Sequence, residues 1–276
     1  MDIEPLGGAL GAVIRGIDIR DAADDEIASI RQALLDHEVV FFRNTGIDDV
    51  GHLGFAGRFG TPSIFPLSKV LGERSPSLQT ITDSAESPPS TDYWHTDVTW
   101  TAKPPTAAFL RATVVPGRGG DTMWGSMTAA YEGLSTEMRR FCDGLHVRHD
   151  NESFIRGMER KLGVEAAAPI AAKLREGYPS VEHPLVRTHP ENGRRALLWG
   201  GGFMRSIVEL ESRESDAFLA LLLRHIDQPV FHARWRWGVG DLVIWDERST
   251  VHRGLSDHYP LAREVRRCVI DGDRPV

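Results

Sequence analysis

Hydrophobic and polar positions follow two different periods along the chain. In residues 24–38 (DDEIASIRQALLDHE), Ile27, Ile30, Ala33 and Leu34 recur at helical spacing after an acidic start, which predicts an amphipathic helix. The apolar run VVFFRN at 39–44 predicts a buried strand, and residues 48–60, which end in glycine, predict a second helix. The N-terminal third therefore mixes helices and strands.

From about residue 78 the pattern changes to short apolar runs separated by Gly, Pro and Asp, which favours a β-sandwich or jelly roll. Helices are predicted to interrupt it at 126–145 and 212–227. Residues 151–180 are polar and weakly patterned, and we expect a mobile insert or lid there. No linker divides the chain, which predicts a single domain over 1–276. The predicted strands are LQTITD, TAAFLRATVV, HPLVRTHP, RALLWG, VFHARWRW, DLVIWDE and EVRRCVIDG.

Composition narrows the class of protein. Hydrophobic residues make up 41% of the 276, enough for a sizeable core. The two cysteines match no zinc spacing and fit a reducing cytosol better than a disulfide scaffold. A net charge of -7 without a basic stripe opposes nucleic-acid binding. With no signal peptide and no apolar stretch of about 18 residues, we expect a cytoplasmic protein without a membrane partner.

The stretch YWHTDVTW at 93–100 carries the first chemical signal. Residues i and i+2 of a strand share a face, so His95 and Asp97 could both point at one metal ion. An ordinary surface strand is the bland alternative. His252, which follows the apolar run DLVIW and a polar turn, offers a third ligand. Two histidines and one carboxylate form the facial triad of non-haem iron(II) oxygenases, which leaves positions open for substrate and O₂.

The other histidines have simpler explanations near helix ends, in strands or in turns. The sequence has no G-x-S-x-G elbow, Walker loop, H-E-x-x-H or G-x-G-x-x-G, so competing catalytic interpretations are weak. Arg263 and Arg267 follow His252 and differ by an even number, so they share a strand face if no bulge intervenes. A guanidinium fork is a natural partner for a carboxylate, and a solvated basic strand is the alternative.

Several motifs in order, WHTDVTW, GGDTMWGSMTAAYEGLS, HPLVRTHPENGRRAL, RWRWGVGDLVIWDERSTVHR and REVRRCVI, resemble the taurine/2-oxoglutarate dioxygenase family over nearly the whole chain. This family includes alkylsulfatase-like and aryloxyalkanoate-dioxygenase-like members. The resemblance implies a mainly β fold with flanking helices around a double-stranded β-helix (jelly-roll) core. It also implies iron(II), 2-oxoglutarate and O₂ as cofactor and co-substrates, and a homo-oligomer, a dimer or tetramer.

The resemblance assigns a role to each matching residue. It makes His95, Asp97 and His252 the iron ligands, and it places Thr122 and Arg263 on the distal carboxylate of 2-oxoglutarate. Arg267 would hold the anionic head of the substrate. The remaining residues that it places around the substrate are Phe65, Thr91, Val98 and Phe203, with Phe154, Ile155 and Trp100 nearby.

Charge then predicts the kind of substrate. The charges of iron(II), Asp97, 2-oxoglutarate and Arg263 cancel, which would leave Arg267 as a buried cation that needs an anion. Phe65, Ser68 and Thr91 stand where taurine dioxygenase has a histidine, a tyrosine and an asparagine. We therefore expect a longer or aromatic anion rather than taurine: a sulfonate, an alkyl sulfate ester or an aryloxyalkanoate.

The resemblance implies hydroxylation of this small organic anion, with succinate and CO₂ as co-products. Two alternatives remain at this point. One is a biosynthetic member of the same family that desaturates, cyclises or hydroxylates a natural-product intermediate. The other is a non-catalytic jelly-roll sensor that binds metal, against which Thr122 and both arginines argue. Asp97 argues against a halogenase, in which halide takes the place of the carboxylate.

Overall fold

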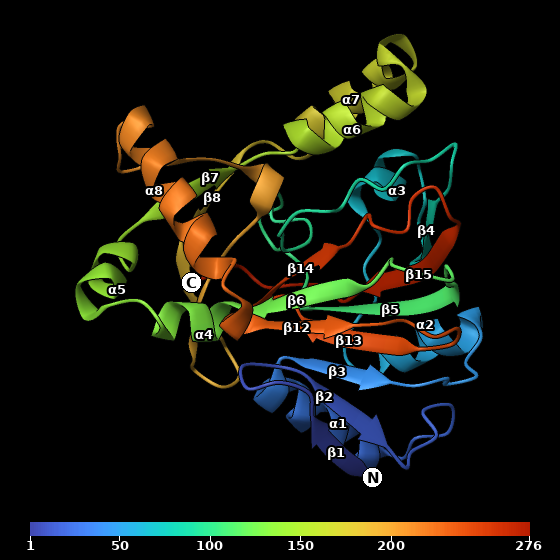
Figure 1. Cartoon of the computed structure of the whole chain (residues 1–276). Helices are drawn as coiled ribbons and strands as arrows, with labels where there is room; N and C mark the ends of the chain where they lie inside the picture. Colours follow the sequence, from blue (N-terminus) through green and yellow to red (C-terminus); the bar gives the residue numbers. More distant parts are fainter.

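A seven-stranded sheet forms the largest layer of the computed structural model, which describes residues 1–276 (Figure 1). The edge strands β1 and β4 have no fully buried residue, whereas the central strands β3 and β13 are buried at every position. All neighbours pair antiparallel except β2 and β3. The strands lie in the order β1 (Asp2–Pro5), β2 (Ala12–Arg15), β3 (Val39–Phe42), β13 (Leu242–Asp246), β5 (Ala107–Val114), β15 (Arg263–Val269) and β4 (Gln79–Asp83).

A three-stranded sheet packs on one face of this layer, in the order β12 (His232–Trp235), β6 (Thr122–Ser126) and β14 (Thr250–Gly254). A buried aromatic cluster joins the two sheets: Phe41 stacks on Trp235 at 4.4 Å, and Trp124 meets Phe41 and Trp245 edge-on. Large rings of this kind fill the space between facing sheets. The sheet-rich architecture with flanking helices that the sequence predicts is confirmed.

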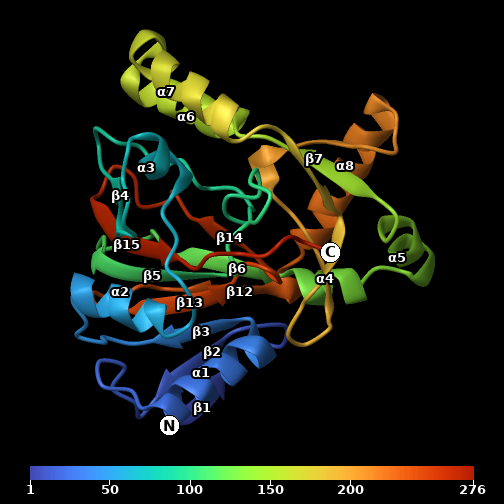
Figure 2. The ribbon, with the colours of Figure 1, turned by 180° about the vertical axis from the view of Figure 1, so that it is seen from behind.

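Helices cover the opposite face of the large sheet. α1 (Asp24–His37) and α2 (Asp49–Gly57) lie there and bury Ile27, Ile30 and Phe55 against strand residues such as Phe109. Figure 2 shows both helices on the side of the large sheet away from the small one. Both lie close to the predicted ranges 24–38 and 48–60, because their apolar stripes and acidic starts are local features.

Most of the remaining strands and helices form a third core beside the two facing sheets. The predicted helix at 126–145 is two helices, because Ser135 accepts a hydrogen bond from Met138 and caps a new start. The elements are α4 (Met127–Glu132), α5 (Thr136–Cys142), α8 (Ser212–Ile226), the short helices η1 (Gly201–Phe203) and η2 (Pro229–Phe231), a sheet of β11 (Met204–Ile207), β7 (His146–His149) and β8 (Val181–Pro184), and a pair of β9 (Val186–Thr188) and β10 (Arg195–Leu197).

The segment 151–180 is more regular than its sequence indicates. It forms a hairpin of α6 (Glu152–Leu162) and α7 (Val164–Gly177), broken at Gly163, which adopts φ 85°. The helices bury Ile155 and Leu174, among other residues, over the short helix α3 (Pro66–Val70). Small alanines fill most of the buried stripe of α7, which weakens the hydrophobic pattern and explains why it escaped sequence reasoning. No helix has both the length and the apolar character needed to cross a bilayer.

One buried acid of the fold gives a stability prediction. Burial raises the pKa of Glu38 from 4.5 to about 7, against the opposing effect of hydrogen-bond partners and Arg194. A raised pKa in the folded state favours folding below pH 4.5, and that contribution is lost as pH rises through 7. Glu38→Gln should therefore gain about 3 kcal/mol over the wild type between pH 4.5 and pH 8 in urea unfolding. Glu132→Gln, the exposed second partner of Arg194, should show no such gain.

Candidate active site

The backbones of His95 and His252 hold each other in place. His95 N–H donates to His252 O at 3.1 Å, and His252 N–H donates to His95 O at 2.8 Å. This single bridge fastens the segment before Asp97 to the middle of β14. Backbone pairing, rather than side-chain contact alone, therefore sets the distance between the two imidazoles.

The strand predicted for YWHTDVTW does not form, so the argument from a shared strand face was wrong. Only His95 makes a bridge, and a turn begins at Asp97 and carries Val98 at φ 55°. A β-branched residue rarely adopts positive φ, and such strain persists only where the surroundings impose it. Here Asp97 N–H donates to Glu247 Oε2 at 3.0 Å, and Thr101 N–H donates to Val98 O at 3.1 Å. The turn brings Asp97 to the histidines.

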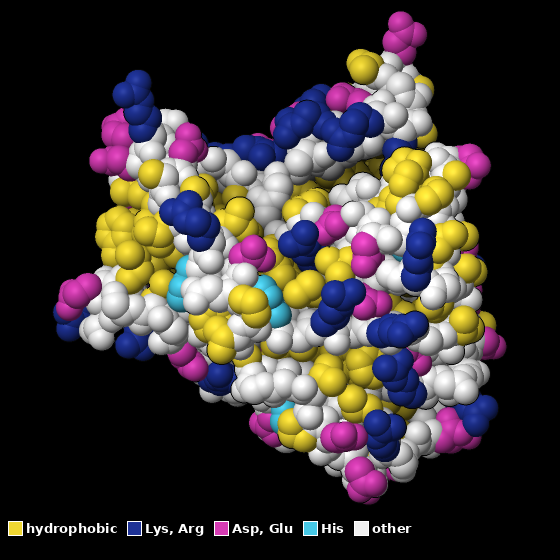
Figure 3. Space-filling view, viewed as in Figure 1, with side chains coloured by type: hydrophobic (Ala, Val, Ile, Leu, Met, Phe, Trp, Pro, Cys, Tyr) yellow, Lys and Arg dark blue, Asp and Glu magenta, His cyan; other side chains and the backbone are white.

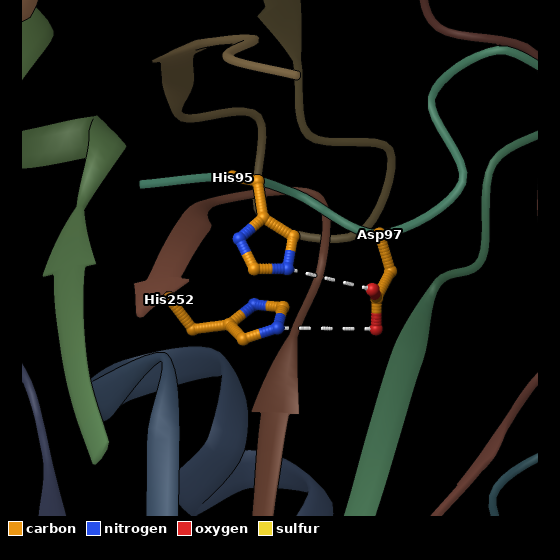
Figure 4. Close-up of side chains that lie close together, drawn as sticks. All are labelled: His95, Asp97 and His252. Carbon is orange, nitrogen blue, oxygen red and sulfur yellow. Dashed lines mark ion pairs between the residues drawn. The ribbon is translucent and has the colours of Figure 1, made fainter. Parts of the chain in front are cut away.

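The three predicted ligands converge. One donor atom from each of His95, Asp97 and His252 lies within 4.8 Å of the others, and all three residues are buried. His95 Nε2 lies 3.9 Å from Asp97 Oδ1, and His252 Nε2 lies 4.0 Å from Asp97 Oδ2. Figure 4 shows the two rings side by side with the carboxylate opposite them. Two imidazoles and one carboxylate in this arrangement are the donor set of a non-haem iron(II) site.

Protonation suits metal binding. Burial lowers the pKa of His252 to about 3 and is also the main cause that lowers the pKa of His95. His95 Nδ1 lies 2.8 Å from Tyr93 O, to which it donates, leaving the Nε2 lone pair toward Asp97. Burial alone would raise the pKa of Asp97, but the charge of Arg267 is the largest of the effects that outweigh burial and hold that pKa far below its usual range. The site offers two neutral imidazoles and one carboxylate.

Arg263 and Thr122 meet at one end of the sandwich, Arg263 from β15 of the large sheet and Thr122 from β6 of the small one. Arg263 is buried, its Nε donates to Gly120 O at 3.0 Å, and its Nη2 lies 3.4 Å from Thr122 Oγ1. Trp237 Nε1 donates to Thr122 Oγ1 at 3.0 Å and orients the hydroxyl. Gly120 has φ 72°, and a Cβ there would lie 2.9 Å from Pro116 Cγ, so this close approach requires glycine.

Arg267 lies on the same strand but has a partner, so the predicted lone cation is wrong. Its Nη1 donates to Asp97 Oδ2 at 2.5 Å, and its Nε and Nη2 donate to Gln79 Oε1 at 3.1 and 2.7 Å. A residue 188 positions away along the chain supplies that amide, which no local pattern could reveal. Arg263, Val265 and Arg267 occupy every second position of β15, so their side chains lie on the same face of the strand. Val265 packs between the two sheets on that face.

An apolar wall stands beside Arg267. The guanidinium lies 5.8 Å from the centre of the Phe65 ring, and Phe65 meets Phe154 edge-on at 5.8 Å. Both rings pack against a cluster that contains Val98 and Phe203 with helix residues of the α6–α7 hairpin. Of the predicted pocket residues, Thr91 stays outside this cluster. It is exposed, and its carbonyl accepts from Gly254 N–H.

Known proteins are similar in sequence to this chain over nearly its whole length. A family model described as taurine catabolism dioxygenase TauD, TfdA family matches residues 2–269. The chain belongs to this family. An alpha-ketoglutarate-dependent sulfate ester dioxygenase of Pseudomonas putida is 34% identical over 278 residues, covering 100% of this chain and 91% of the relative. An alpha-ketoglutarate-dependent 2,4-dichlorophenoxyacetate dioxygenase of Cupriavidus pinatubonensis is 30% identical and covers 99% and 98%.

A solved structure of a related protein is also similar to this chain in fold. AAD-2 in complex with Mn(II) and N-oxalylglycine superposes with a TM-score of 0.81 at 25% identity, over 99% of this chain and 98% of that one. The resemblance predicted from WHTDVTW and the later motifs is confirmed. The match to the TauD, TfdA family spans His95, Asp97 and His252 as well as both arginines.

Sequence reasoning missed one buried acid of the site. Glu247 accepts from Asp97 N–H at 3.0 Å with one oxygen and from Trp245 Nε1 at 2.8 Å with the other. Burial, and then the nearby Asp97 charge, raise the pKa of Glu247 well above its usual range. The only signal was its place at the end of the predicted strand DLVIWDE, two residues after Trp245. Its role is to hold the turn that presents Asp97.

Proposed function

We propose that His95, Asp97 and His252 bind the iron(II) of a 2-oxoglutarate-dependent dioxygenase that hydroxylates a small organic anion. The convergence of two neutral imidazoles and one carboxylate in a buried site carries this proposal. The enzyme class is confirmed by the family, since relatives are named as alpha-ketoglutarate-dependent dioxygenases, alpha-ketoglutarate being 2-oxoglutarate. Iron(II), 2-oxoglutarate and O₂ are its cofactor and co-substrates. A related structure holds Mn(II) and N-oxalylglycine, an analogue of 2-oxoglutarate.

Each residue has a distinct part in the reaction. Bound iron(II) supplies the oxidising chemistry, by which 2-oxoglutarate and O₂ become succinate and CO₂ while one oxygen atom enters a C–H bond of the substrate. Arg263 and Thr122 hold the distal carboxylate of 2-oxoglutarate, which leaves its keto-acid end facing the metal ligands. Glu247 and the backbone bridge keep the ligands in register. The apolar wall excludes water from the reacting atoms.

The same surroundings favour an anion with an apolar body as substrate. Arg267 provides the cation beside Phe65, where its guanidinium donates to Asp97 and to Gln79. In Figure 3 dark blue Lys and Arg side chains lie along the α6–α7 hairpin, which carries the exposed Arg156. Sulfate esters, on which the Pseudomonas relative acts, and aryloxyalkanoates both have this form. Taurine lacks the apolar body.

The proposal also covers the core architecture, the lid, the cellular compartment and the oligomeric state. The two facing sheets form a double-stranded β-helix core in a single domain over 1–276, and the hairpin at 151–180 is a mobile lid over the substrate. The protein works in the cytoplasm as a homo-oligomer. Helices α5 and α8 carry exposed apolar side chains, including Phe141 and Leu223. Figure 3 shows a yellow patch over these helices on the left, which supports such an assembly.

A succinate-release assay tests the function. Protein loaded anaerobically with iron(II) and 2-oxoglutarate is exposed to O₂ with sulfonates, alkyl sulfate esters and aryloxyalkanoates in turn. Stimulation of succinate release by one of these classes supports the proposal. If iron and 2-oxoglutarate bind and no class stimulates release, the substrate assignment is wrong. If neither binds, the metal-site assignment fails as well.

Arg267→Gln should weaken binding of the organic substrate in this assay. Loss of a charged hydrogen-bond donor to a bound anion raises the substrate KM by about 10- to 100-fold. The KM for the co-substrate should change by much less, because Arg263 is untouched. Arg266→Gln is the matched control, since the neighbouring arginine points to Glu264 and Thr80 instead. An unchanged substrate KM in Arg267→Gln would refute the role of Arg267.

A further inference from the structure

A carboxylate, that of Asp83, lies beside Arg263, the arginine assigned to 2-oxoglutarate. Asp83, the last residue of β4, lies directly across from Arg263 in the strand pair of β4 and β15. Asp83 Oδ2 lies 3.6 Å from Arg263 Nη1 and 3.4 Å from His258 Nε2. One carboxylate oxygen thus lies between two basic side chains.

His258 is the other unexplained member of this cluster. It is 1% exposed, its Nδ1 lies 3.1 Å from Leu255 O, and its Nε2 has no hydrogen-bond partner. A buried polar atom without a partner is costly, so its position calls for a reason. Gly120 brings the two basic groups together, because a Cβ there would lie 3.2 Å from Arg263 Cδ and 3.3 Å from His258 Cγ. His258 and Arg263 therefore pack side by side on the same backbone.

The guanidinium has one edge available for a carboxylate. Arg263 Nε already donates to Gly120 O, and Nη2 faces Thr122 Oγ1, so an incoming carboxylate must use Nη1 and Nη2. Asp83 faces Nη1, but the separation of 3.6 Å exceeds the roughly 2.7–2.9 Å of a charge-assisted hydrogen bond. Asp83 neutralises the arginine without being firmly bonded to it.

We propose that Asp83 is a resident counter-ion that competes with the distal carboxylate of 2-oxoglutarate for Arg263, and that His258 takes up Asp83 when the co-substrate binds. Without 2-oxoglutarate, Asp83 lowers the cost of burying the Arg263 charge. With 2-oxoglutarate present, two carboxylates would face one guanidinium. His258 Nδ1 donates to Leu255 O, so Nε2 donates only when both ring nitrogens carry a proton, and in that form His258 offers the displaced Asp83 a donor. This inference rests on the proposed function and adds to it a pair of residues that sets the affinity for the co-substrate.

The test compares two 2-oxo acids that differ only at the far end. Binding of 2-oxoglutarate and of 2-oxovalerate, which carries a methyl group in place of the distal carboxylate, is measured by calorimetry without O₂ on the Mn(II)-loaded protein. Asp83→Asn should bind 2-oxoglutarate about tenfold more tightly, a change of about 1.4 kcal/mol, and bind 2-oxovalerate as the wild type does. His258→Leu should weaken 2-oxoglutarate alone, and His258→Gln, which keeps a donor, should restore wild-type binding.

The two acids separate the possible outcomes. Weaker or unchanged 2-oxoglutarate binding in Asp83→Asn overturns the inference, because Asp83 would then position Arg263 or do nothing. Equal changes for both acids also overturn it, since they reveal a general disturbance of the site. If Asp83→Asn fails to fold, the variants His258→Leu and His258→Gln provide the test. Unchanged 2-oxoglutarate binding in His258→Leu, or equal changes for both acids, then overturns the inference. If wild-type protein binds neither acid, the proposed function fails and takes the inference with it, whereas a preference for 2-oxoglutarate untouched by these variants defeats the inference alone.

Discussion

His252→Ala is expected to abolish succinate formation, with a loss on the order of 10³-fold or more, or about 4 kcal/mol at about 1.36 kcal/mol per factor of ten. The neutral imidazole is one of only three donors, and its Nε2 has no substitute within reach of Asp97 other than His95. Removing it leaves two ligands, too few to fill one face of the metal. The ring also packs 4.8 Å from Trp245, so the melting temperature will fall modestly as well.

Metal content separates these two effects. Iron(II) bound per protein after dialysis should drop with His252→Ala even at temperatures where the variant is folded. His146→Ala, which removes an exposed histidine paired with Glu209, is the control and should retain iron and turnover. A folded His252→Ala protein that still bound iron and formed succinate at the wild-type rate would contradict the facial-triad assignment.

Arg263→Ala is expected to have the second largest effect. It should raise the KM for the co-substrate 2-oxoglutarate by about 10²-fold or more, because truncating one partner of a buried charge pair costs about 2–5 kcal/mol. The guanidinium is buried beside Asp83. Burial lowers the pKa of Arg263, and the charge of Asp83 opposes that shift. The KM for the organic substrate should change little, since Arg267 serves that end of the site.

The neighbouring Arg266→Ala variant is the matched control on the same strand. It removes a partly exposed arginine that pairs with Glu264, and both KM values should stay near those of the wild type. A rise in both KM values with Arg263→Ala would show that β15 had shifted as a whole. A rise confined to the organic substrate would exchange the roles proposed for the two arginines.

Local pattern predicted much of this protein correctly. The apolar stripe of α1 and the buried run of β3 were readable because a helix or strand chooses its buried face from its own residues. The convergence of His95, Asp97 and His252 was predicted for a related reason, because imidazole and carboxylate in a short motif are chemically distinctive. Helix α7 was missed because its buried alanines carry little hydrophobic contrast.

Contacts between distant segments were beyond sequence reasoning. Asp97 reaches the metal site through a turn that depends on Glu247, 150 residues away. The edge strand β4 supplies both partners of the arginines on β15. Gln79 bonds to Arg267, and Asp83 lies opposite Arg263. Periodicity states which face of an element is buried, but not which element covers it.

The sequence by itself determined the kind of chemistry: the ligand types, the arginine pair and the family that carries them. The tertiary structure alone decided the electrostatics of the site. It placed Asp97 against Arg267 and Asp83 between Arg263 and His258. Charge interactions fall with distance in space and depend on burial, and only the packing of the two sheets sets both.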